Sequence, residues 1–203
     1  MSPPNQRRLG GASGLREYTA PLSYCVEEHE SIVDSLYRQS SYAPDRVLFE
    51  RPIHSEWVPV TARQFASEVR SLACGWINLG IQPGDRIALL SQTRYEWMLF
   101  AYSIWSCGAV VVPIYPSSSA EQIHHILKDS GARYVVVENQ QNLGTVLERD
   151  TPATVQDIYV IEKSAVEQVT AAGRGEVGCN AELDQRIADL TAVSYTHLRA
   201  HET

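Results

Sequence analysis

The sequence predicts an α/β fold in which a doubly wound, mainly parallel sheet carries helices on both faces. Three observations predict it. Short runs rich in β-branched or aliphatic residues occur at 86–90, 110–113, 134–137 and 158–161; the segments between them have helical periodicity; and Gly, Pro or Asp turns mark the junctions. Strands that alternate with helices pack as parallel strands joined by right-handed crossovers. No internal repeat or low-complexity stretch interrupts the alternation.

The first elements are a hairpin and a long helix. Residues 47–49 and 57–58 predict two short strands, with the turn at residues 52–56. Thr61 followed by Gln64 forms a capping-box pattern that predicts a helix start, and Gly80 predicts its end. Apolar residues recur along this helix at steps of four and three and so predict one buried stripe: Phe65, Val69, Leu72, Trp76 and Leu79.

The second helix of the alternation is expected to be buried on nearly every side. It follows the Pro83-Gly-Asp85 turn and the strand 86–90, and Thr93 with Glu96 is expected to cap it. A helix that is apolar all round lies between two layers of structure. Its predicted core face consists of five residues: Trp97, Phe100, Ala101, Ile104 and Trp105.

The alternation continues to the end of the chain. Residues 110–112 predict a buried strand, and Ser118 with Glu121 predicts the start of a third helix, which Gly131 ends. A strand at 134–137, a short helix at 142–149 and a strand at 158–161 follow. Residues 165–172 and 182–190 are helix-like.

Composition and charge exclude several classes of protein. The chain has 203 residues, 44% of them hydrophobic, which is enough for one domain with a real core. Its net charge of −7 argues against nucleic acid as a partner. Residues 97–119 carry no charge, but Ser106-Cys-Gly108 divides them into a buried helix and a buried strand, so we expect no transmembrane segment.

The termini and the cysteines indicate a cytoplasmic protein. Residues 1–17 have no apolar run after their arginines, so we expect a disordered leader and not a signal peptide. The four cysteines are far apart and form no C-x-x-C pair. This spacing favours reduced, partly buried thiols over disulfides or a zinc site: Cys25, Cys74, Cys107 and Cys179.

Several strings together resemble the amino-terminal region of long-chain fatty acid–CoA ligases, which belong to the AMP-forming acyl-CoA synthetases of the adenylate-forming superfamily. They are Ser91-Gln-Thr-Arg-Tyr-Glu-Trp97, Cys107-Gly-Ala-Val-Val-Val-Pro-Ile-Tyr-Pro116, Ser117-Ser-Ser-Ala-Glu-Gln-Ile123 and Ile126-Leu-Lys-Asp-Ser130, supported by residues 61–81 and 84–86. The resemblance covers residues 18–190. It is specific as an ensemble, since each string alone is only a capped helix or a strand.

The resemblance implies a parent enzyme that joins a fatty acid to coenzyme A through an acyl-adenylate, with ATP and Mg²⁺ consumed or required. Fatty acid, ATP and CoA would be its partners, with peripheral membrane association allowed. The family holds ATP with a Thr/Ser/Gly-rich loop that ends in Pro-Lys-Gly, and no such string occurs in this sequence. We therefore assign no catalytic, cofactor-binding or metal-binding residue, and expect the chain alone to be inactive and to bind none of these molecules.

The domain organisation follows from the same resemblance. Residues 18–192 are interpreted as a partial amino-terminal domain, because residues 182–190 stand where the family approaches its phosphate loop. Residues 193–203 resemble a translated library adapter and are interpreted as a non-native tail. An ordinary frayed terminus is the next interpretation. A metal-binding pair formed by His197 and His201 ranks third, since it has no acidic or cysteine companion.

Other local motifs have simpler explanations. The segment 173–178 matches G-x-G-x-x-G, but it follows a helix-like stretch and is interpreted as a loop. Residues 10–14 are glycine-rich but lack the Lys-Ser/Thr of a phosphate loop. Residues 117–119 favour helix capping over anion binding. His124 and His125 are adjacent, so they point to different faces of a helix. The four tryptophans are expected to pack in the core: Trp57, Trp76, Trp97 and Trp105.

One alternative from another functional class stays open. A free-standing, non-catalytic α/β module for binding or interaction would show the same alternation of strands and helices. A dinucleotide-dependent oxidoreductase is disfavoured, because the junction between the first strands and the first helix holds Pro59-Val-Thr61 where a glycine signature would be needed.

Overall fold

The computed structural model describes residues 30–173 and 179–193, with side chains to residue 190. Its centre is a sheet of four parallel strands in the order β4-β3-β5-β6. These are β3 (Arg86–Leu90), β4 (Val110–Ile114), β5 (Tyr134–Val137) and β6 (Asp157–Val160). The register sets Leu90 of β3 between Ile114 and Val137 of its neighbours. All four predicted strands are therefore confirmed, parallel and in one sheet.

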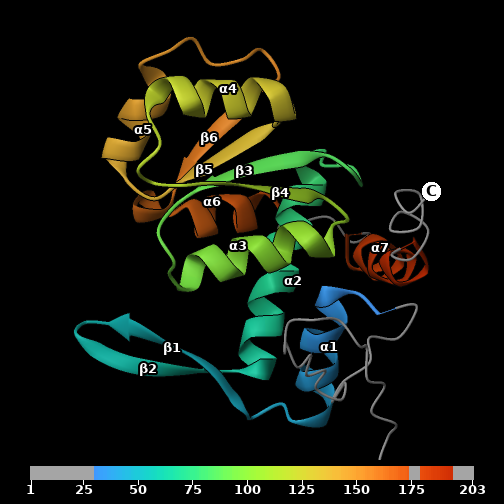
Figure 1. Cartoon of the computed structure of the whole chain (residues 1–203). Coiled ribbons are helices and arrows are strands. Elements are labelled where there is room, and N and C mark those ends of the chain that lie inside the picture. The colour runs from blue at the N-terminus through green and yellow to red at the C-terminus, as the bar shows by residue number, and fades with distance from the viewer. Residues whose placement is uncertain (1–29, 174–178, 194–203) are drawn as a thin grey trace, which may run out of the picture.

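Helices cover both faces of this sheet, as predicted. Helices α2 (Ala62–Asn78), α3 (Tyr95–Ser106) and α6 (Ala165–Ala172) lie on one face, and α4 (Ala120–Ser130) and α5 (Gln140–Leu147) lie on the other (Figure 1). The strands divide their side chains between the two layers because successive residues point to opposite faces. Ile87 and Leu89 face the first layer, whereas Ala88 and Leu90 face the second.

Helix α2 forms as its sequence predicts. Thr61 accepts a hydrogen bond from the Gln64 N–H at 3.3 Å, and the Gln64 side chain accepts one from the Thr61 N–H at 2.8 Å. This reciprocal pair satisfies two amides that the first turn would otherwise leave unpaired. The predicted stripe is buried from Phe65 to Trp76, and Leu79 packs partly buried against it.

Ahead of α2 lie helix α1 (Ile32–Tyr42) and a hairpin of β1 (Val47–Ile53) and β2 (Glu56–Thr61) that projects from the body (Figure 1). The hairpin strands are longer than expected. Their turn is at His54 and Ser55, which both have positive φ and so match the right-handed twist of the strands. The prediction that Trp57 lies in the core is wrong: it is 69% exposed, since it stands beside the projecting turn.

Two predicted helix caps are wrong by one residue. Helix α3 begins after Arg94, not Thr93; no side chain caps it, and the Glu96 carboxylate instead accepts a hydrogen bond from Arg94 Nε at 2.6 Å. Helix α4 begins after Ser119, which forms a capping box with Gln122, so the expected pair Ser118 and Glu121 is displaced. Several residues of the Ser/Thr/Glu/Gln type stand at each start, and the backbone geometry chooses among them.

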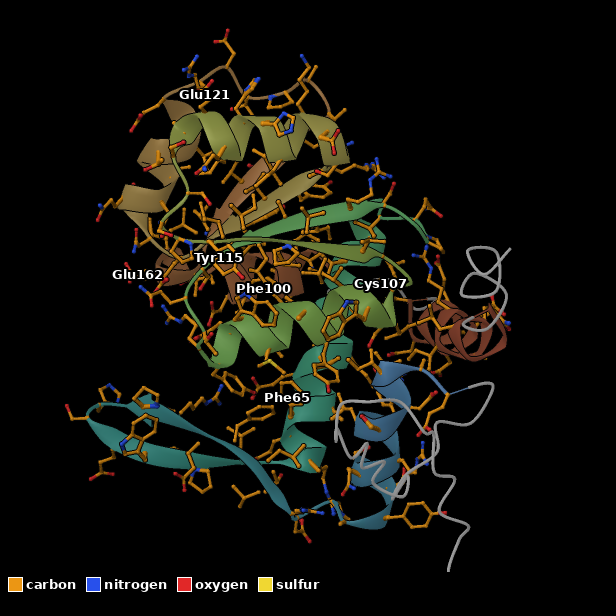
Figure 2. All side chains as sticks on the ribbon, in the orientation of Figure 1. Phe65, Phe100, Cys107, Tyr115, Glu121 and Glu162 are labelled. Atoms are coloured by element: carbon orange, nitrogen blue, oxygen red, sulfur yellow. A yellow bond between two sulfur atoms is a disulfide. The ribbon has the colours of Figure 1, made fainter. Side chains whose placement is uncertain are left out.

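The interpretation of β4 as a buried strand is also wrong. Val110 is 46% exposed. Tyr115, which Figure 2 labels, lies just beyond the strand and is 82% exposed. The reason is the strand order, because β4 lies at one end of the described sheet and is covered by fewer side chains than β3. Hydrophobic sequence alone does not reveal position within a sheet.

The last described helix, α7 (Cys179–Val193), packs against α2 and follows the 3₁₀ turn Ile161–Lys163 and α6. Leu183 is fully buried. Arg186 is also buried, and its Nη1 donates to the carbonyls of Ile81 at 2.8 Å and Cys107 at 3.3 Å. These bonds attach α7 to the loop before β3 and to the end of α3.

The cysteines correct the expectation of reduced thiols. Cys74 on α2 and Cys179 on α7 form a disulfide, and Cys107 is a buried free thiol. Sequence spacing does not reveal the pairing, because the two partners are 105 residues apart. Cys25 lies outside the described residues, as do the predicted leader 1–17 and residues 194–203 of the predicted tail.

Across residues 30–173 and 179–193, none of the helices combines the length and the hydropathy needed to cross a bilayer.

Candidate functional site

The first place to look for a site is the carboxyl edge of the sheet, between β3 and β5. The chain leaves β3 toward β4 and leaves β5 toward β6, so the two connections run in opposite directions. Ligands of open α/β sheets bind in the crevice at such a switch point. Figure 2 shows Tyr115 and Glu162 near this end of the strands.

Charged side chains fill this switch point, but they satisfy one another. Glu138, directly after β5, accepts a hydrogen bond from the Gln92 N–H at 2.8 Å and contacts Arg94 Nη1 at 3.4 Å. Arg94 also donates to Glu96. The hydrogen bond to Glu96 and the charges of Glu96, Glu138 and Glu162 raise the pKa of Arg94. A guanidinium shared by two carboxylates has little left to hold an anion, so this cluster crosslinks β3 to β5.

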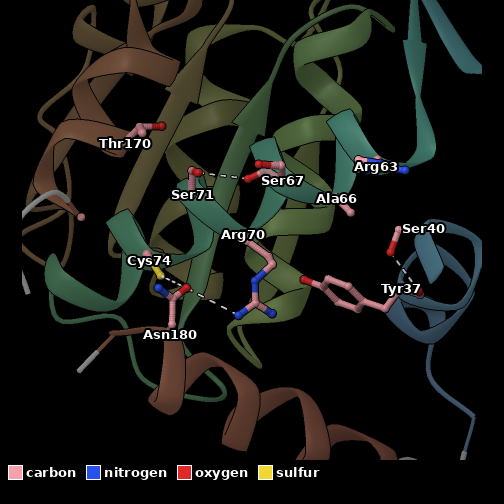
Figure 3. Close-up of a pocket in the computed structure, with 11 residues that line it drawn as sticks. Tyr37, Ser40, Arg63, Ala66, Ser67, Arg70, Ser71, Cys74, Thr170 and Asn180 are labelled. Carbon is pink, nitrogen blue, oxygen red and sulfur yellow. Dashed lines mark hydrogen bonds between the residues drawn. The ribbon is translucent and has the colours of Figure 1, made fainter. Parts of the chain in front are cut away.

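A larger hollow lies on the other side of the molecule, between α1, α2, α6 and α7 (Figure 3). Its volume is about 530 Å³, within the range of small-molecule pockets. Hydroxyls and two guanidiniums dominate its lining: Tyr37, Ser40, Arg63, Ala66, Ser67, Arg70, Ser71, Cys74, Thr170, Gly173 and Asn180. We call it the α2 cavity.

Arg70 is the central charge of the α2 cavity. Its Nη1 donates to Asp184 at 2.7 Å and its Nη2 to Asn180 at 3.5 Å, so it connects α2 to α7. Tyr37 closes the far side, with its hydroxyl 3.1 Å from Ser106 Oγ, and burial raises the pKa of this phenol. The cavity therefore offers neutral hydroxyls and a partly neutralised positive charge.

Sequence reasoning did not select the α2 cavity. Ser67, Arg70, Ser71 and Cys74 follow one another at steps of three, one and three along α2, on the side away from the Phe65–Trp76 stripe. A polar stripe at helical spacing was the available signal. Such stripes usually mark a solvated helix face, and only the packing of α1, α6 and α7 around α2 turns this one into a hollow.

A second, smaller hollow of about 400 Å³ lies under the hairpin. Arg51 of β1 forms two contacts of 3.2 and 3.3 Å with the Glu68 carboxylate, and Tyr95 donates its hydroxyl to the same carboxylate at 2.9 Å. The Arg51 guanidinium also lies 4.8 Å from the centre of the Tyr95 ring. Burial and the charge of Glu68 raise the pKa of Tyr95, which therefore remains a donor. This network holds the hairpin to α2 and α3.

The remaining sequence motifs find structural roles where they are described. Of residues 117–119, Ser119 caps α4, in keeping with the capping interpretation. His124 Nδ1 lies 2.9 Å from the Asp150 carbonyl, and His125 is exposed on α4. Gly173 ends α6 next to Gly75 of α2. Outside the described residues lie the segments 10–14 and 174–178 and the pair His197 and His201. Within the described residues, no three His, Cys, Asp or Glu side chains are grouped to hold a metal ion.

Comparison with known proteins identifies the family. The family model described as AMP-binding enzyme matches residues 36–196, most of the chain. The chain belongs to the AMP-binding enzyme family. The AMP-forming acyl-CoA synthetases that the sequence resembles are its relatives.

Three relatives show how much of the family this chain represents. It is 35% identical over 180 residues to the long-chain-fatty-acid–CoA ligase FadD15 of Mycobacterium bovis, covering 87% of this chain and 30% of FadD15. The solved N-terminal domain of FACL13 from Mycobacterium tuberculosis is 26% identical with a TM-score of 0.60, over 73% of this chain and 37% of that one. The uncharacterized protein Rv1549 of Mycobacterium tuberculosis is 27% identical over 128 residues, covering 61% of this chain and 72% of Rv1549. The chain thus spans about 30% of the length of the curated ligase that it matches.

Proposed function

We propose that this chain is the amino-terminal part of a long-chain fatty acid–CoA ligase that works in the cytoplasm. The parent enzyme would convert a fatty acid, ATP and CoA to acyl-CoA, AMP and diphosphate through an acyl-adenylate. The observation that carries the proposal is the 35% identity to FadD15 across 87% of the chain, with the fold of the FACL13 N-terminal domain. Residues 18–192 would form the partial domain.

In this proposal the described residues build a scaffold. Forming an acyl-adenylate requires phosphate-binding donors, an acidic group for the metal and a cation at the reacting oxygens. At the switch point Arg94 and Glu138 already pair with each other, so we assign neither to ATP nor to Mg²⁺. We infer that the groups that bind ATP, Mg²⁺ and CoA lie in parts of the parent enzyme that this chain does not include.

The chain alone would then be inactive. Positioning two reactants contributes about 7–11 kcal/mol of barrier lowering, and a chain that cannot hold ATP forfeits this contribution. The exposed Val110 in β4 and the exposed Tyr115 just beyond it support a second expectation, that the chain aggregates through this sheet edge.

The test is to express residues 1–192 and measure ATP binding by calorimetry, together with fatty-acid-dependent pyrophosphate release. We expect no saturable heat and no turnover above a heat-inactivated control. Saturable ATP binding would contradict the proposal and favour a nucleotide-binding module.

A free-standing binding or interaction module is the second candidate. The similarity to Rv1549 favours it. That alignment of 128 residues covers 72% of Rv1549, whereas the alignment of 180 residues covers 30% of FadD15, so Rv1549 is much the shorter protein. Sequencing the DNA downstream of codon 190 separates the two candidates. A ligase requires an open frame that continues into a Thr/Ser/Gly-rich loop with a lysine, whereas a module requires a stop codon without such a loop.

A further inference from the structure

The disulfide between α2 and α7 lies at the wall of the α2 cavity. Cys74 and Cys179 have Cα atoms 5.7 Å apart, within the usual range of about 4.4–6.8 Å. Both residues are buried. Of the two, Cys74 is among the residues that line the cavity, so a molecule inside it meets the Cys74 sulfur first (Figure 3).

The charges around the cavity favour an anionic ligand. Arg70 stands one helical turn before Cys74 on α2, and Asn180 Oδ1 lies 3.5 Å from Arg70 Nη2 and 3.9 Å from Cys74 Sγ. Arg63 also lines the cavity, but it stands about three helical turns before Cys74 and is paired with Asp45 at 3.5 Å. Arg70 is paired with Asp184 of α7, but the Asp184 side chain is 63% exposed. Solvent therefore screens this ion pair, and Arg70 keeps part of its attraction for an anion. A guanidinium near a sulfur, as Arg70 is here, stabilises thiolate anions, which are the attacking and leaving groups of thiol–disulfide exchange.

The other described thiol does not compete for this reaction. Cys107 has no exposed surface, and burial raises the pKa of its thiol to about 12. Its S–H donates to the carbonyls of Ser103 at 3.1 Å and Ala73 at 3.3 Å. A thiol held in this way remains protonated and packed, so an attacking thiolate must come from outside the described fold.

We propose that the Cys74–Cys179 disulfide is a thiol-exchange site, attacked at Cys74 Sγ by a small anionic thiol that enters the α2 cavity. The incoming thiolate forms a bond to Cys74 Sγ while the bond between the two cysteines breaks. The electron pair goes to Cys179 Sγ, which takes a proton from water. A second molecule of the thiol then releases Cys74 as a thiol and leaves as the oxidised, dimeric form of the reagent.

Exchange would loosen the start of α7 and leave the rest attached. Cys179 is the first residue of α7, and Asn180 and Asp184 are the partners of Arg70. Farther along the helix, Leu183 and Arg186 are buried against the body and are independent of the disulfide. The first turn of α7 is therefore the part that responds to the thiol state.

The test uses the full chain with Cys25→Ser, so that the thiols at positions 74, 107 and 179 are the ones followed. The protein is incubated without oxygen in millimolar reduced glutathione, an anionic thiol, then alkylated and mapped by mass spectrometry. We expect a cross-linked peptide pair before treatment, glutathione on Cys74 with a free thiol on Cys179 at short times, and free thiols on both cysteines later. Cysteamine, a cationic thiol, should react several-fold more slowly.

Two matched variants, each with one cysteine of the pair replaced, test the preference for Cys74 in the absence of the disulfide. With oxidised glutathione, Cys179→Ser should acquire a mixed disulfide at Cys74 several-fold faster than Cys74→Ser acquires one at Cys179, and near-ultraviolet circular dichroism checks that both remain folded. The proposal is overturned if the untreated chain carries no cross-link between the two cysteines, if the cross-link survives glutathione, or if glutathione is found on Cys179. Equal rates for glutathione and cysteamine would overturn the role of Arg70.

Discussion

The two faces of the central sheet are built from different side chains. The face under α2, α3 and α6 is rich in rings that touch one another, as Phe65 and Phe100 do with their neighbours (Figure 2). The buried cluster under α4 and α5 contains only aliphatic side chains among the described residues. The aromatic face also carries buried polar bonds, such as Trp76 Nε1 to Ser103 Oγ at 3.2 Å. Aromatic rings and directional hydrogen bonds favour a single packing arrangement, whereas aliphatic side chains can pack in several.

The largest expected effect comes from breaking the aromatic face at Trp76. This side chain is fully buried and contacts the rings of Phe100, Tyr134 and Tyr159. Trp76→Ala should lower the free energy of unfolding by about 3–5 kcal/mol, because the cavity that it leaves cannot close around rings held on three elements. Urea unfolding followed by circular dichroism measures this change. A loss no greater than that of Ile123→Val on the aliphatic face would contradict the comparison.

The closeness of α2 and α6 on the aromatic face gives a second prediction. A Cβ at Gly75 would lie 2.0 Å from the Val169 carbonyl oxygen, so Gly75→Ala should destabilise the fold by about 1–3 kcal/mol through overpacking. Gly144 in α5 is the matched control, since a Cβ there meets nothing within 4 Å. Gly144→Ala should stabilise by about 0.5–1 kcal/mol, because alanine favours the helix. Thermal unfolding of the two variants should therefore shift in opposite directions.

A smaller effect is expected at the start of α4 on the aliphatic face. Ser119→Ala removes the side chain that accepts from the Gln122 N–H and should lower stability by about 1 kcal/mol. Ser118→Ala is the control, because Ser119 and not Ser118 is the capping residue. Equal losses for the two variants in urea unfolding would restore the sequence-based assignment of the cap to Ser118.

The last prediction concerns an effect that disappears with pH, at the ion pair that joins the starts of β3 and β5. Partial burial of Asp85 acts to raise the pKa of its carboxyl, but hydrogen bonds from the Gln82 N–H and Arg133 outweigh this and lower it below 3.8. A lowered pKa stabilises the fold above pH 3.8, and the contribution is lost as pH falls through the folded-state pKa. Asp85→Asn should therefore lower stability by about 1 kcal/mol at pH 7. The two stability curves should converge in acid; a constant gap would contradict the assignment.

Local features of the fold were predictable because local chemistry sets them. The Thr61–Gln64 cap, the Gly131 helix end and the runs of β-branched residues each act over a few residues, and each is confirmed. Even α1, which was not predicted, has a local signal, since Ser31 and Asp34 form its capping box. Such local signals place a helix start only to within one residue, as the errors at α3 and α4 show.

Long-range features were not predictable from the chain. The strand order leaves β4 exposed, the disulfide joins residues 105 apart, and the α2 cavity needs four helices to enclose it. No periodicity encodes these pairings, because they depend on which elements become neighbours after folding. The exposure of Trp57 has the same origin, since a hairpin's sequence does not say how far it projects.

The attachment of Arg186 to the carbonyls of Ile81 and Cys107 has a consequence for the order of events during synthesis. The aliphatic cluster is complete once residue 160 has left the ribosome, because its buried members lie between residues 88 and 160. The aromatic face is complete only after α7 has been synthesised, because Arg186 of α7 donates to the carbonyl of Ile81, which lies 105 residues earlier in the chain. Contacts of such long sequence separation form late and slowly. A nascent chain would therefore expose its aromatic side longest, and that side is where we expect a chaperone to bind.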